Sequence, residues 1–132
     1  MALLGLVFCL ITGCTTTKHP PSEDKPAQSE HRTITAQEAY ELMQESTDFI
    51  LVDVRTPQEY EEGYIEGAIL IPDYELAERA KSELPDKTTT IIVYCRSGRR
   101  SAASASLLFR LGYQSVLDLG GISSWPYETV KP

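Results

Sequence analysis

Histidine, cysteine and net positive charge are all scarce in this chain of 132 residues. Its two histidines, His19 and His31, both lie in a polar N-terminal stretch, which argues against histidine-based catalysis in the domain that follows. Its three cysteines, Cys9, Cys14 and Cys95, are too few for a disulfide framework, and no Cys/His spacing suggests a zinc site. We therefore expect neither a metal nor a cofactor.

An excess of basic residues is also lacking. The chain has 19 Asp and Glu against 12 Lys and Arg, a formal net charge of -7. A phosphate backbone would be repelled overall, so nucleic acid is not expected as a partner. A small anion can still bind where positive groups gather locally. The length allows one domain with some chain to spare.

The N-terminus resembles a bacterial lipoprotein signal. Residues 2–13 form an uncharged apolar run, too short for the ~20 residues that span a bilayer but suited to the hydrophobic region of a signal peptide. The run ends in Leu-Ile-Thr-Gly-Cys at Cys14, which is similar to a lipobox, although no Lys or Arg precedes it. We predict a signal peptide over 1–13 and lipidation at Cys14; a retained anchor is the alternative.

Residues 14–32 are rich in Pro, Ser, Thr and charge and hold no aromatic or aliphatic side chain larger than Ala after Cys14. Such a segment cannot bury enough surface to offset its ordering entropy, so we predict a flexible tether. The tether would hold a domain over 33–132 off a membrane, at the cell envelope and outside the cytoplasm. Processing would remove Cys9 and block Cys14, which leaves Cys95 as the free thiol.

Strand and helix patterns alternate along 33–132. Apolar runs predict buried strands over 49–54, 68–71, 90–94 and 115–119, with a fifth at the edge near 32–34. Capping boxes at Thr35 and Thr56 predict helices beginning at 36 and 57, and Asp73 can cap a helix that runs through Leu84. Gly112 supplies the stop for a predicted helix over 99–111. This alternation indicates an α/β fold with a mostly parallel sheet.

Cys95 follows the third predicted strand, where ligands gather in such folds. The next residues, Arg96, Ser97 and Gly98, form a tight loop whose amide N–H groups should converge at the start of a helix. Arg99 and Arg100 have the wrong sign for a helix N-terminus unless an anion sits among them. The same field stabilises a thiolate, so we interpret Cys95 as a nucleophile for an anionic substrate.

A purely structural role for Cys95 and the arginines is the alternative interpretation. A cysteine at a strand end is often a small buried hydrophobe, and first-turn arginines are often merely solvated. The tight loop in a domain without other cysteines favours the functional interpretation. Asp53 and Arg55 end the strand over 49–54 and are expected to support the loop; a structural pair, Asp53 with Arg55 or Arg55 with Glu59, is the alternative.

Three segments in order resemble the rhodanese (thiosulfate sulfurtransferase) family. They are Cys-Arg-Ser-Gly-Arg-Arg-Ser at 95–101, Leu-Val-Asp-Val-Arg at 51–55 with the residues up to 68, and Asp-Leu-Gly-Gly-Ile-Ser-Ser-Trp at 118–125. The resemblance implies a three-layer domain with a five-stranded sheet flanked by helices. Tyr64 and Leu70 depart from it, because His and Asn are frequent there.

The resemblance also implies a chemistry. Cys95 would accept a sulfane sulfur and become a persulfide, held by the backbone amides of 96–100, and the arginine side chains would attract thiosulfate or a similar small anionic donor. The acceptor would be a thiol or cyanide, and a thioredoxin-like protein is a candidate reductant.

Two alternatives stay open at this stage. Phosphatases and arsenate reductases of the related fold use Cys-x5-Arg, whereas Cys95 to Arg100 is Cys-x4-Arg, a shorter loop that favours sulfur. The other alternative is a catalytically silent binding module of the envelope.

Overall fold

Five strands form one sheet in the computed structural model, which describes residues 30–132. The strands are β1 (Glu30–Thr33), β2 (Phe49–Asp53), β3 (Ile69–Leu70), β4 (Thr90–Cys95) and β5 (Ser115–Gly121). Their order is β1-β5-β4-β2-β3, and each neighbouring pair is parallel. The predicted α/β fold with a five-stranded parallel sheet is confirmed.

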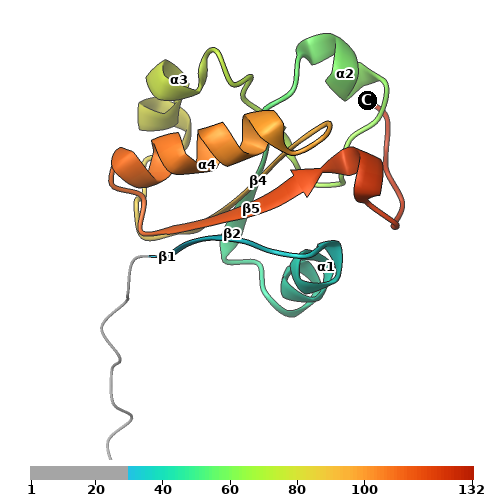
Figure 1. The fold of residues 1–132 in the computed structure, drawn as a ribbon, viewed down its shortest axis with the longest axis horizontal. Helices are drawn as coiled ribbons and strands as arrows, with labels where there is room; N and C mark the ends of the chain where they lie inside the picture. Colours follow the sequence, from blue (N-terminus) through green and yellow to red (C-terminus); the bar gives the residue numbers. More distant parts are fainter. Residues whose placement is uncertain (1–29) are drawn as a thin grey trace, which may run out of the picture.

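Helices cover both faces of the sheet. Figure 1 shows α1 (Ala36–Glu45) on one face and α3 (Leu76–Glu83) with α4 (Arg99–Arg110) on the other. The short α2 (Pro57–Glu61) and the 3-10 turn η1 (Ile122–Ser124) lie toward the end at which the arrow of β5 points. Within residues 30–132, no helix has the length and apolar character needed to cross a membrane.

Local sequence signals explain where two of the helices begin. Thr35 accepts a hydrogen bond from the Glu38 N–H while the Glu38 carboxylate accepts one from the Thr35 N–H. Thr56 and Glu59 form the same reciprocal pair at α2, where Pro57 follows the cap. Both predicted capping boxes are confirmed, and each satisfies helix donors that would otherwise lack partners.

A hydrophobic core lies on each side of the sheet and fixes β4 between them. Val93 and Cys95 face the core under α3 and α4, whereas Ile92 and Tyr94 face the core under α1. All four side chains are fully buried. Because interiors pack closely, the strand that ends in Cys95 is held rigidly.

Strand β1 begins before the predicted domain boundary at residue 33. Glu30 already donates its N–H to the Gln114 carbonyl, at 2.6 Å, and β1 pairs with β5 from Glu30 onward. His31 and Arg32 are exposed, so backbone hydrogen bonds rather than an apolar pattern define this edge strand. The predicted tether therefore loses residues 30–32; the rest of it, with the predicted signal peptide, lies outside the described residues.

The predicted helix from Asp73 is wrong at its start. The helix begins at Leu76, and the side chain of Asp73 accepts from the neighbouring Tyr74 N–H instead of capping it. The Asp73 N–H donates to the Val54 carbonyl, which keeps Asp73 in line with the preceding edge strand. That strand is also shorter than predicted, and Ile69 within it is exposed rather than buried.

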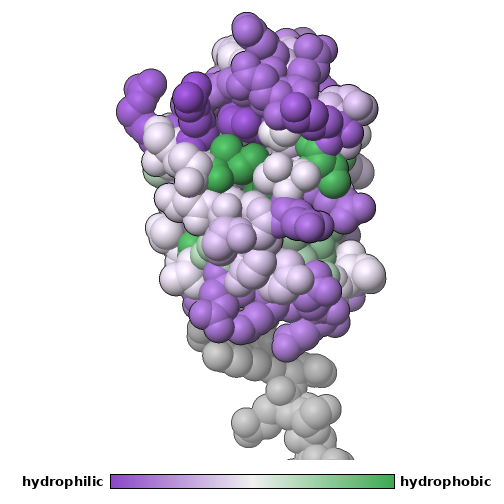
Figure 2. All heavy atoms as spheres, turned by 90° about the vertical axis from the view of Figure 1, so that its right-hand side faces the viewer, coloured by the Kyte–Doolittle hydropathy of each residue, from purple (hydrophilic) through white to green (hydrophobic). Residues whose placement is uncertain are grey.

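Parallel register brings the carboxyl ends of the strands to one edge. Cys95 lies beside Gly121 of β5, and Tyr94 lies beside Asp53 of β2. Figure 2 faces this edge and shows a band of weakly polar and hydrophobic residues between two strongly hydrophilic regions. Loops that follow β2, β4 and β5 therefore share one surface.

Candidate active site

Cys95 is the last residue of β4, and three residues separate it from α4. The chain turns at Gly98, whose φ of +103° is a conformation that side chains disfavour. This turn directs the Gly98 N–H at the Cys95 Sγ, with an N–S distance of 3.0 Å. The tight loop that was predicted to turn at Gly98 is thus present, and its backbone bends around the Cys95 sulfur.

The start of α4 supplies further donors to this sulfur. The first N–H groups of a helix have no carbonyl partner within it, and here they include those of Arg99, Arg100 and Ser101. Burial by itself raises the pKa of the Cys95 thiol. Hydrogen bonding from the Ser101 and Gly98 N–H groups leads the effects that outweigh burial, so the pKa lies below that of an ordinary cysteine.

The end of β5 forms the floor of the loop. A Cβ on Gly121 would lie 2.4 Å from the Arg96 carbonyl oxygen and 2.7 Å from the Ser97 Cα, closer than real Cβ atoms come. The Ser123 N–H donates to the same Arg96 carbonyl at 3.2 Å. The backbone of β5 therefore sets how closely the loop after Cys95 approaches the sheet. Position 121 needs glycine because any Cβ there would collide with that loop.

The Ser101 hydroxyl joins the two segments. Its Oγ lies within hydrogen-bond distance of two carbonyl oxygens to which it can donate, that of Gly98 at 3.0 Å and that of Gly120 at 3.3 Å. Ser101 is fully buried. Its side chain therefore links the loop to the end of β5, while its N–H faces the sulfur.

The three arginines of the loop have different surroundings. Arg96 and Arg99 are exposed, and neither forms an ion pair with another residue of 30–132. Arg100 is half-buried and forms two hydrogen bonds with the carboxylate of Glu59, each 2.8 Å long. Of the three arginines expected to attract an anionic substrate, Arg100 therefore already has its charge balanced by Glu59.

Asp53 and Arg55 lie beneath the site as a buried ion pair. Arg55 donates through Nε and Nη2 to the Asp53 carboxylate, with a shortest distance of 2.7 Å, and through Nη2 to the Gly63 carbonyl. Its guanidinium also lies 5.7 Å from the centre of the Tyr94 ring. The hydrogen bonds join the end of β2 to Gly63, and only the contact with the Tyr94 ring reaches β4, so this geometry favours the structural pair of Asp53 with Arg55.

Sequence reasoning missed the part played by two residues. Glu59 was considered as a partner of Arg55, but it pairs with Arg100, which lies 41 positions along the chain. Ser101 was read only as part of the motif, although its buried hydroxyl braces the loop. The capping box already marks Glu59 as ordered, and only the fold brings Arg100 to it.

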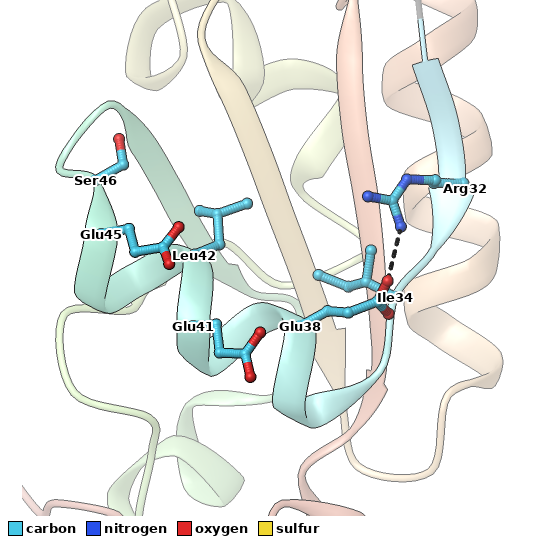
Figure 3. A pocket seen from close by; sticks show the side chains of 7 residues that line it. All are labelled: Arg32, Ile34, Glu38, Glu41, Leu42, Glu45 and Ser46. Atoms are coloured by element: carbon cyan, nitrogen blue, oxygen red, sulfur yellow. Dashed lines mark ion pairs between the residues drawn. The ribbon is translucent and has the colours of Figure 1, made fainter.

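Other features of residues 30–132 do not compete with the Cys95 loop. No group of three or more His, Cys, Asp or Glu in this range could hold a metal ion. A cavity of about 300 Å³ lies between β1 and α1 (Figure 3), where Arg32 pairs with Glu38. Its further carboxylates, Glu41 and Glu45, lie on the exposed face of α1. No cysteine lines that cavity.

Comparisons with known proteins agree with this geometry. Residues 35–127 match the family model described as a rhodanese-like domain. The thiosulfate sulfurtransferase PspE of Escherichia coli is 39% identical over 80 residues, which are 61% of this chain and 77% of that protein. A sulfurtransferase of Allochromatium vinosum is 42% identical over 82 residues, which cover 61% and 75% of the two chains.

Solved structures extend the likeness to the fold. A rhodanese-related protein of Thermoplasma volcanium superposes with a TM-score of 0.66 at 36% identity, covering 75% of this chain and 97% of that one. A rhodanese-like domain protein of Staphylococcus aureus gives a TM-score of 0.68 at 31% identity, with 76% and 98% covered. The chain therefore belongs to the family of rhodanese-like domains and is a sulfurtransferase of the rhodanese type.

Proposed function

We propose that the protein transfers a sulfane sulfur from thiosulfate, or a similar small anionic donor, to a thiol or cyanide through a persulfide on Cys95. The observation that carries the proposal is the position of the Cys95 Sγ, 3.0 Å from the Gly98 N of a loop whose donors lower the pKa of the thiol. A thiolate is the nucleophilic form of cysteine, and the same donors suit a persulfide anion. Relatives named as thiosulfate sulfurtransferases support the choice of donor.

The proposed first step forms one sulfur–sulfur bond and breaks another. The Cys95 thiolate attacks the outer sulfur of thiosulfate, and sulfite leaves with the electron pair of the broken bond. The product is a cysteine persulfide anion within the loop. Exposed Arg96 and Arg99 would attract the dianionic donor, so replacing both with glutamine should raise the KM for thiosulfate more than it lowers kcat.

The second step returns the enzyme to its starting state. An acceptor thiolate attacks the outer sulfur of the persulfide, takes that sulfur, and releases the Cys95 thiolate. Cyanide accepts the sulfur in the same way to give thiocyanate. A thioredoxin-like dithiol would instead release it as sulfide and become a disulfide, which makes such a protein a proposed reductant.

Intact-mass measurement tests the persulfide. Protein treated with thiosulfate and then desalted should gain the mass of one sulfur atom, and cyanide should remove that mass and yield thiocyanate. Cys95→Ser, which changes one buried atom, should show neither effect. Absence of the adduct with thiosulfate and with polysulfide would contradict the proposal. Cys95-dependent hydrolysis of an aryl phosphate would point instead to a phosphatase.

We also propose that the domain is attached to a membrane at the cell envelope through lipid on Cys14. The support is the sequence pattern alone, an apolar run of 12 residues that ends in a lipobox-like segment. Metabolic labelling with a fatty acid should mark the protein, and Cys14→Ala should abolish the label. Cys9→Ala is the matched control and should keep it. Equal labelling of both variants would refute the anchor.

A further inference from the structure

A second cavity shares no lining residue with the Cys95 loop and has a different chemistry. Its volume is about 560 Å³, within the range of binding pockets, and it is bounded by α1, the loop before β3 and the segment after η1. We call it the aromatic pocket. The residues that matter here are Tyr40, Phe49, Glu66, Trp125, Tyr127 and Glu128.

Three aromatic rings are arranged around one another at this pocket. Tyr40 and Tyr127 stack with ring centres 3.9 Å apart, and Trp125 meets Tyr127 edge-on at 4.9 Å. Tyr40 is 37% exposed, an unusual exposure for so large a ring held in a stack. The rings are fixed in place and still offer surface to a ligand, which lowers the entropy lost on binding.

Charge at the pocket has one sign. Glu66 and Glu128 line it and are exposed, and neither forms an ion pair with any residue of 30–132. No Lys or Arg lines the pocket. The Trp125 indole N–H is already used by the Glu128 carbonyl, at 3.3 Å. The pocket therefore presents π faces and carboxylate acceptors, which together suit a cationic group on an apolar stem.

Two hydrogen bonds run from residues at or near the pocket to the residues on either side of Cys95. The Ile65 N–H donates to the hydroxyl of Tyr94, the residue before Cys95, at 3.1 Å. The Ser123 N–H of η1 donates to the Arg96 carbonyl. Figure 1 shows α1 and η1 toward the same end of the molecule as the arrow of β5. Segments that line or adjoin the pocket are thus connected by hydrogen bonds to the residues on either side of Cys95.

We propose that the aromatic pocket docks a basic segment of a protein partner, with a lysine or arginine side chain on the aromatic rings between Glu66 and Glu128. The two carboxylates belong to two different chain segments that line the cavity, so they can meet two basic side chains of one peptide. A single small amine would leave most of the 560 Å³ unfilled. This proposal concerns binding and does not rest on the persulfide.

Fluorescence of Trp125 reports on the pocket directly, because it is the single tryptophan of the chain. The probe is an acetylated and amidated five-residue peptide of alternating lysine and leucine, added to the full chain. We expect a saturable change in emission that weakens as salt is added. Peptides with glutamine or glutamate in place of lysine should give no saturable change. An equal change in emission with the glutamine peptide would overturn the proposal that the pocket binds a cationic side chain.

Paired variants separate the pocket from the overall charge. Glu66→Gln together with Glu128→Gln should lower the affinity for the lysine peptide by about 2- to 5-fold per carboxylate, the range of exposed ion pairs. Glu61→Gln with Glu62→Gln removes the same charge from exposed positions outside the pocket and should leave affinity unchanged. An equal loss of peptide affinity in the two double variants would overturn the proposed site. So would sedimentation that shows a dimer occupying the pocket, with the dimer lost in the first pair alone.

Discussion

Replacing Gly121 with alanine is expected to disable the Cys95 loop without disturbing the backbone conformation at position 121. Gly121 has φ -102° and ψ 135°, an extended conformation that alanine adopts freely. The added Cβ would lie 2.4 Å from the Arg96 carbonyl oxygen, and real Cβ contacts begin near 3.0 Å. The loop and β5 must therefore separate by about 0.6 Å at this point.

The expected loss follows from that displacement. Overpacking of this kind typically costs about 1–3 kcal/mol of stability. A shift of about 1 Å at a catalytic group can cost on the order of 100-fold in rate, so 0.6 Å should lower thiocyanate formation by roughly 10- to 100-fold. The Gly98 N–H would also move relative to the Cys95 Sγ, which should raise the pKa of the thiol.

Gly67→Ala provides the matched control. Gly67 has φ +84°, so alanine there costs about 1–2 kcal/mol of backbone strain, but its Cβ would have no neighbour within 4 Å. It should lower the melting temperature by an amount similar to Gly121→Ala and leave activity unchanged below that temperature. If Gly121→Ala keeps wild-type activity while losing the same stability, the loop is not fixed by β5 and the reasoning fails.

Two charge changes give further predictions. Arg55→Met removes the charged partner of the buried Asp53 carboxylate and leaves it the backbone N–H of residue 55, so it should cost about 3–5 kcal/mol in urea denaturation; a loss below about 1 kcal/mol would show that the pair is unimportant. Glu59→Gln leaves the charge of Arg100 uncompensated, so the pH midpoint of Cys95 alkylation, followed by peptide mass spectrometry, should fall, whereas a merely disordered loop would raise it. Hydrogen bonding to Arg100 lowers the pKa of Glu59 to about 2, so the stability that Glu59 adds should be complete above about pH 5 and fade as the pH drops toward 2.

Elements with a local physical cause could be predicted from the sequence. The capping boxes at Thr35 and Thr56 and the apolar runs that became β2 and β4 were read correctly, because caps and burial patterns depend on neighbouring residues. Elements that depend on residues far away along the chain could not be predicted from the sequence. β1 is polar and is held by β5, and the backbone of Asp73 is held to Val54 at the end of β2.

The sequence by itself determined the chemistry of the site. The Cys-x4-Arg spacing from Cys95 to Arg100, a glycine at the turn and a helix directly after it specify amide donors around one sulfur, since all of these lie within seven residues. Only the tertiary structure decided which charges remain available there. Glu59 neutralises Arg100 and Gly121 admits the loop, because parallel register brings the ends of β4 and β5, and the start of α2, to one edge.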